Sequence, residues 1–208
     1  MDIWTEWKDH YRTMGLDGAN ICEDGIINKQ KYDATHPRIL FVLRETNEFT
    51  GGLAQLLADG PHYPMWYAVA RWAAGILKAF PPFEEVDKDA ILQDAIQRIA
   101  VINLKKVTGG AAADLITINA YAYRDRVLLS KQIRSIAPEI IVACGTFDAL
   151  IWLLDVAIEP GEPHVKAVLD KTTGARVVPF VHPARVDKRV TYQRLTSLLS
   201  PETAGRGL

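Results

Sequence analysis

The chain has 208 residues, 49% of them hydrophobic, and a formal net charge of −1, a composition typical of one globular domain. The near-neutral charge argues against a broadly basic nucleic-acid binder, although it leaves room for a basic rim around a cleft. The two cysteines form no CxxC pair, which excludes a zinc ribbon or a four-cysteine iron–sulfur cluster within the chain. Residues 1–8 lack the apolar core of a signal peptide, and no apolar run is long enough to cross a bilayer, so we expect a cytoplasmic protein.

The first part of the chain predicts a helical segment followed by a buried strand. Aromatic residues at helical spacing predict an amphipathic helix over residues 3–14, in an N-terminal segment that ends near residue 36. The apolar run that ends at residue 43 is typical of a strand buried on both faces, and a polar loop follows it. Residues 66–80 predict a helix that is apolar all round and that Pro81-Pro82 ends.

The rest of the chain continues the alternation of helices and strands. The further expected elements are, in chain order, a helix over residues 87–98, a strand over 99–104, a loop over 105–113, a helix over 124–136, a strand over 139–145, a helix over 147–154, two paired strands over 165–169 and 176–181, and a closing helix over 190–199. This order predicts a three-layer α/β/α fold with a short, mostly parallel central sheet. We expect one domain over residues 1–208, with its core over residues 38–199.

Three of the expected parallel strands end in polar residues. In open parallel sheets, ligands bind beyond the carboxyl ends of the strands. The polar ends are Arg44-Glu45-Thr46-Asn47, Asn103 with Lys105-Lys106, and His182-Pro183-Ala184-Arg185. The strand over residues 139–145 ends instead in Cys144-Gly145-Thr146, for which we expect a structural role. A functional site is therefore expected where the three polar ends converge.

These segments, taken in order, resemble the uracil-DNA glycosylase superfamily. Residues 39–47 resemble the family's catalytic segment after the first strand, and residues 101–104 resemble the segment whose asparagine reads the base. Residues 136–146 resemble the third strand and its entry, and residues 181–185 resemble the closing His-Pro segment. The resemblance covers residues 38–199 and implies the family's α/β/α fold. It also implies a hydrolase that cleaves the N-glycosidic bond of uracil or a related damaged base, with single- or double-stranded DNA as partner and no metal or cofactor. We expect a monomer.

The resemblance assigns roles around a flipped base. Glu45, with Glu48 as its local rival, is the candidate to align water and to stabilise the cationic sugar. His182 is the candidate donor to the base as negative charge develops on it. The candidates for contact with the base are Asn47, Phe49 and Asn103. Asn103 would read its edge and Phe49 would stack on it.

Basic residues at two of the strand ends are candidates for contacts with DNA phosphates. They are Lys105, Lys106, Arg185, Lys188 and Arg189. The five histidines show no metal-ligand spacing, so no metal site is expected. Ordinary structural roles are the alternatives, such as capping a turn for Glu45 or satisfying loop backbone groups for Asn103.

Two other functions stay open. Residues 43–47 lack the glycine and proline typical of the family's catalytic segment, and Glu45 stands where the family often has a shorter aspartate or asparagine. This departure favours, as an alternative, a non-catalytic nucleic-acid or nucleotide binder on the same fold. The third function is that of an unrelated nucleotide-handling α/β protein with a different substrate.

Overall fold

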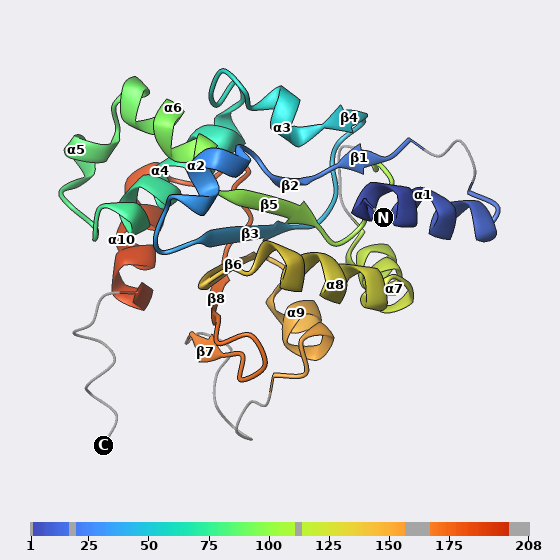
Figure 1. Cartoon of the computed structure of the whole chain (residues 1–208). Coiled ribbons are helices and arrows are strands. Elements are labelled where there is room, and N and C mark those ends of the chain that lie inside the picture. The colour runs from blue at the N-terminus through green and yellow to red at the C-terminus, as the bar shows by residue number, and fades with distance from the viewer. Residues whose placement is uncertain (1, 17–19, 111–113, 157–166, 200–208) are drawn as a thin grey trace.

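The structure is a computed structural model that describes residues 2–16, 20–110, 114–156 and 167–199. Its centre is a six-stranded, mostly parallel sheet with helices around it (Figure 1). In spatial order the strands are β2 (Gly25–Ile26), β5 (Ala100–Asn103), β3 (Ile39–Leu43), β6 (Ile140–Cys144), β8 (Arg176–Phe180) and β7 (Val168–Leu169). The four inner strands are parallel, and the short edge strands β2 and β7 are antiparallel to their neighbours. As expected, the chain is a mixed α/β protein.

The inner strands are apolar nearly throughout, so they present apolar side chains to both faces of the sheet, and both faces are buried. On one face, Phe41, Val142 and Val178 pack in a core with α4 (Pro64–Leu77), α6 (Asp89–Gln97) and α10 (Lys188–Leu199). On the other face, Leu40, Val42 and Ile141 pack in a second core. The helices of that core are α1 (Ile3–Thr13), α7 (Leu115–Arg124), α8 (Arg126–Ile136) and α9 (Phe147–Leu153). The short helices are α2 (Lys29–Asp33), α3 (Leu53–Leu56) and α5 (Phe83–Val86).

A second, two-stranded sheet lies beyond the carboxyl ends of β3 and β5. It pairs β1 (Cys22–Glu23) with β4 (Gly51–Gly52) in parallel (Figure 1). The loops after β3 and β5 also bond to each other, because the Gly109 N–H donates to the Thr46 carbonyl at 2.9 Å and the Glu48 N–H donates to the Gly109 carbonyl at 3.1 Å. These bonds hold the loop after β3 as an extension of the sheet.

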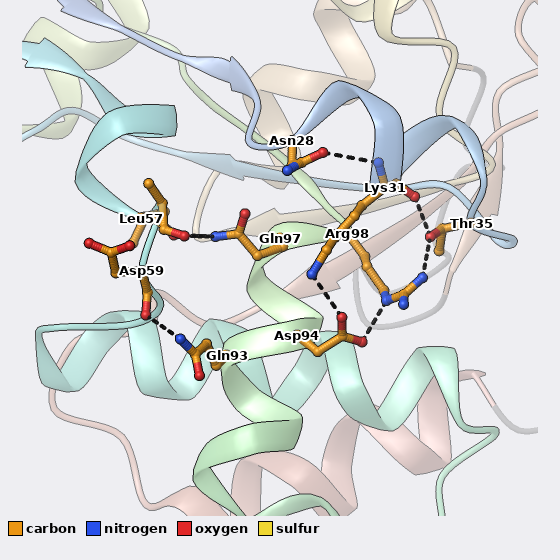
Figure 2. A network of polar contacts seen from close by, with 10 residues as sticks. Asn28, Lys31, Thr35, Leu57, Asp59, Gln93, Asp94, Gln97 and Arg98 are labelled. Carbon is orange, nitrogen blue, oxygen red and sulfur yellow. Dashed lines mark hydrogen bonds and ion pairs between the residues drawn. The ribbon is translucent and has the colours of Figure 1, made fainter.

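The amino-terminal edge of the sheet is tied together by polar side chains of α6 (Figure 2). Asp94 accepts from Lys31 at 3.0 Å and from Arg98 at 2.6 Å, which joins α6 to α2. Gln97 donates to the Ala58 carbonyl at 2.9 Å and also to the Leu57 carbonyl, which joins α6 to the segment after α3. This network lies at the edge opposite to the polar strand ends, so it supports the fold and not the expected site.

Most expected elements are present, but the short elements β1, β2, β4, α2, α3 and α5 were not predicted, and three further differences concern the longer elements. The helix expected over residues 66–80 ends at Leu77, because Ala79 and Phe80 both have a φ of 56° and turn the chain before the two prolines. The helix α7 was not predicted. Asp114 begins it by accepting from the N–H groups of Ile116 and Thr117 at 3.2 and 3.1 Å. The expected strand over residues 165–169 is described only in part, and that part, β7, pairs with β8 as expected.

No described helix has the length and apolar character that a membrane crossing requires.

Candidate functional site

The carboxyl ends of β3 and β8 are separated by β6, so their polar residues start about 10 Å apart. The side chain of Arg44 crosses this gap over Gly145, the residue that follows β6, and its Nε donates to the Gly145 carbonyl at 3.3 Å. A Cβ atom on Gly145 would lie 2.7 Å from Arg44 Nη2, and the φ of Gly145 is 68°. Glycine is therefore required here for two reasons: the backbone is left-handed, and Arg44 occupies the space that a Cβ atom would need.

His182 lies at the end of β8 and is half-buried. Burial, together with the nearby positive charge of Arg44, lowers the pKa of His182 from 6.5 to about 4. The Ala184 backbone N–H donates to His182 Nδ1 at 3.3 Å, so the neutral ring carries its hydrogen on Nε2. At neutral pH this residue is an uncharged hydrogen-bond donor next to a guanidinium group.

A cavity of about 330 Å³ lies at the carboxyl edge of the sheet, lined by Gly145 and Val181 next to this pair but not by Arg44 or His182 themselves. Gly145 and Thr146 after β6, and Phe180 and Val181 at the end of β8, form its strand side. Asn119 of α7 and Arg194 of α10 bring an amide and a guanidinium to its rim. We call it the carboxyl-edge cavity. Its volume lies at the lower end of the range for small-molecule sites, which suits a base or a nucleoside.

Glu45 turns away from Arg44, towards the loop after β5. Its carboxylate pairs with the Lys105 ammonium, and both side chains are nearly buried, with 7% and 8% of their surface exposed. Gly109 lies against the same carboxylate so closely that a Cβ atom there would overlap it. Glu45 and Lys105 therefore join the loops after β3 and β5. This placement differs from the expected free carboxylate and from the expected phosphate contact of Lys105.

Asn103 and Lys106 belong to a buried network around Asp24. The backbone N–H and the side-chain Nδ2 of Asn103 donate to Asp24 Oδ2 at 2.8 and 3.3 Å, and Lys106 Nζ donates to both carboxylate oxygens at 2.7 and 3.0 Å. The side chains of Lys106 and Asp24 are fully buried. Burial lowers the pKa of Lys106, and the Asp24 carboxylate opposes this effect. The structure therefore places the Lys106 ammonium inside the protein, paired with Asp24, and not at the surface where a phosphate contact was expected.

The side-chain Nδ2 of Asn103 is committed to this network, whereas its Oδ1 is buried and has no hydrogen-bond partner among the described residues. The residue is only 1% exposed, and its Nδ2 donates to a carboxylate and not into the carboxyl-edge cavity. Asn119, which lines that cavity, is exposed, and its side chain has no hydrogen-bond partner among the described residues. The side-chain amide among the residues that line this cavity is therefore that of Asn119.

The other expected contact residues lie around the same edge of the sheet. Asn47 is exposed beside Gly109, and Phe49 packs partly buried against the core below the loop. Lys188 donates to Asp87 at 2.7 Å and Arg189 donates to Glu84 at 2.5 Å, so carboxylates already neutralise both charges. Arg185 is exposed and has no carboxylate partner within the described ranges. Of the five expected phosphate contacts, Arg185 is the one that the structure leaves ready for an anion.

Five residues of the site were assigned no role from the sequence: Arg44, Gly145, Asn119, Asp148 and Arg194. A glycine directly after a buried parallel strand is one signal that could have been used, because side chains from adjacent strand ends need space there. Arg44 was expected only as the first residue of a polar strand end, without a role of its own. Asn119 lies in the helix that the sequence did not predict. Within the described part of the chain, no group of three His, Cys, Asp or Glu side chains could hold a metal ion.

Comparison with protein-family models gives no match for this chain. A search of curated proteins gives no match either. The functional proposal therefore depends on the geometry of the carboxyl edge and on the resemblance of its segments.

Proposed function

We propose that the chain is a hydrolase of the uracil-DNA glycosylase type, which cleaves the N-glycosidic bond of uracil or a related damaged base in DNA. The observation that supports this most is the neutral Nε2–H donor of His182 beside the carboxyl-edge cavity, with Arg44 next to it. The order of the segments along the chain, and a mostly parallel sheet with helices around it, also fit that family.

The proposed chemistry uses these charges in a simple way. Cleavage of an N-glycosidic bond leaves negative charge on the departing base and positive charge on the sugar. A neutral imidazole can donate to a base oxygen as its charge develops, and the fixed guanidinium of Arg44 adds to the same stabilisation. A donor of this kind contributes about 3–4 kcal/mol to transition-state stabilisation, which is a factor of several hundred in rate.

A carboxylate must align the water and stabilise the cationic sugar. Glu45 is buried against Lys105 in the loop after β5 and does not line the cavity, and Asp148, at the start of α9, is the acidic residue among those that line it. We therefore assign the water-aligning role to Asp148 and a positioning role to Glu45, which fixes the loop that carries Arg44. Asn119 reads the base edge, and Arg185 and Arg194 bind phosphates.

The test is release of free uracil from an end-labelled, uracil-containing oligonucleotide, followed by alkaline cleavage of the abasic strand. His182→Ala and Asp148→Asn are expected to lower the single-turnover rate at least a hundredfold. His36→Ala is the matched control, because His36 precedes β3 at the opposite edge of the sheet and is expected to leave the rate unchanged. Wild-type rates in His182→Ala would refute the assignment of the donor.

The pairing of Glu45 with Lys105 favours a second candidate function, a non-catalytic binder of nucleic acid or nucleotides on the same fold. In that case the wild type would bind the oligonucleotide without release of base, and Arg44→Met would weaken this binding. Release of uracil by the wild type would exclude this candidate.

A further inference from the structure

An unusual apolar surface lies next to the carboxyl-edge cavity. Nine large hydrophobic side chains are exposed within the described residues, and five of them lie on α7, α9 and the first turn of α8. They are Leu115, Ile116, Tyr123, Val127 and Trp152. An exposed cluster of this kind on a protein surface usually marks a binding site.

Two of these side chains, Tyr123 and Trp152, stack on each other as an exposed aromatic pair, which we call the platform. The rings of Tyr123 and Trp152 stack with their centroids 5.1 Å apart and an angle of 23° between the planes, and the residues are 60% and 48% exposed. The guanidinium carbon of Arg126 lies 5.1 Å from the centre of the Tyr123 ring. Among the described residues, Arg126 has no carboxylate partner, so its charge is available to an anion beside the rings.

The platform is continuous with the carboxyl-edge cavity. On α7, Asn119 lines the cavity and Tyr123 follows four residues later on the same face of the helix. On α9, Asp148 lines the cavity and Trp152 again follows four residues later. Since each residue of a helix advances about 1.5 Å, the platform lies only about 6 Å along both helices from the rim of the cavity.

We infer that the Tyr123–Trp152 platform is a stacking site for an unpaired nucleobase, next to the base held in the carboxyl-edge cavity. The inference rests on the proposed function, and it adds a path for the nucleic-acid strand across the protein surface. The strand leaves the cavity between α7 and α9, one base stacks on the platform, and Arg126 contacts a phosphate. A base in a duplex presents no free face to these rings, so the site selects single-stranded nucleic acid.

The chemistry of the surface favours this partner over a second protein. Exposed aromatic rings with a nearby unpaired arginine are the combination that single-strand binders use, because every base has a π-face and every nucleotide has a phosphate. The platform also adjoins a cavity of the size of a base, which a protein partner would not need.

The test measures the Kd of a fluorescein-labelled, single-stranded oligothymidylate by fluorescence anisotropy at fixed low salt. Trp152→Ala is expected to raise the Kd about tenfold, and Trp152→Phe, which keeps a ring, to restore most of the affinity. Val127→Ala is the matched control, because Val127 is 71% exposed on the same surface but has no ring, and its Kd should equal that of the wild type. Binding is also expected to quench the emission of Trp152, the most exposed tryptophan of those described, and this quenching should vanish in Trp152→Phe.

Three results would overturn the inference. They are an unchanged Kd in Trp152→Ala, an equal loss of affinity in Trp152→Ala and Val127→Ala, and a dimer by light scattering that Trp152→Ala converts to a monomer. The last of these would make the surface a contact between two copies of the chain. Base release separates this inference from the proposed function. Binding that depends on Trp152 without release of uracil would refute the glycosylase activity alone. Uracil release with the same KM in the wild type and Trp152→Ala would refute the stacking site alone.

Discussion

Gly145→Ala is expected to damage the site through the side chain of Arg44. Alanine must adopt the φ of 68° found at this position, which costs about 1–2 kcal/mol of the free energy of unfolding. Its Cβ would also lie 2.7 Å from Arg44 Nη2, so the guanidinium must move. Because Arg44 is the smaller of the two causes of the low pKa of His182, after burial, this pKa is expected to rise above 4 but to stay below 6.5.

The assay is a pH titration of the His182 ring protons by NMR, assigned with His182→Ala, together with urea unfolding at pH 7. Gly174→Ala is the matched control, because Gly174 has a φ of 74° but open space around its Cα. It should lose a similar free energy of unfolding and leave the His182 pKa near 4. If Gly145→Ala also leaves that pKa unchanged, Arg44 does not act on His182 as the structure indicates.

The pH dependence of stability tests the same histidine. His182 is protonated in the unfolded chain below pH 6.5 but stays neutral in the folded chain down to about pH 4, so the wild type loses stability as the pH falls through this window. After allowance for solvent screening at this half-exposed site, His182→Asn should remove about 1–2 kcal/mol of that loss in urea unfolding. If the free energy of unfolding of the wild type and of His182→Asn changed equally with pH, this expectation would be contradicted. Lys106→Met should lower the free energy of unfolding by about 3–5 kcal/mol, because it leaves a buried carboxylate without its partner, and a loss below 1 kcal/mol would show that the pair is not buried in solution. Gly109→Ala should cost about 1–3 kcal/mol by overlap with the Glu45 carboxylate, whereas Gly110→Ala meets no neighbouring atom, and equal urea midpoints for the two variants would refute this packing.

The location of the candidate site could be predicted from the sequence, but only some of the residues that form it. The expectation that function lies at the carboxyl ends of the parallel strands needs only the strand pattern, and the cavity beside His182 lies there. The assignment of Asn103 as the base reader could not be tested by sequence, because its partner Asp24 lies 79 residues away. Lys106 looked like a surface cation for the same reason, since a lysine is exposed unless a specific distant carboxylate is buried with it.

The sequence by itself determined the elements of the inner sheet and most of the helices that cover it. Apolar runs and helical periodicity are local properties, and they specify a strand or a helix wherever burial agrees with them. Only the tertiary structure decided which side chains meet. The insertion of β6 between β3 and β8 places the Arg44 side chain over Gly145, where its charge acts on His182, and the pairing of β5 with β3 brings Lys105 to Glu45. These contacts depend on strand order and on the direction of each side chain beyond the strand end, and neither is encoded in the spacing of residues along the chain.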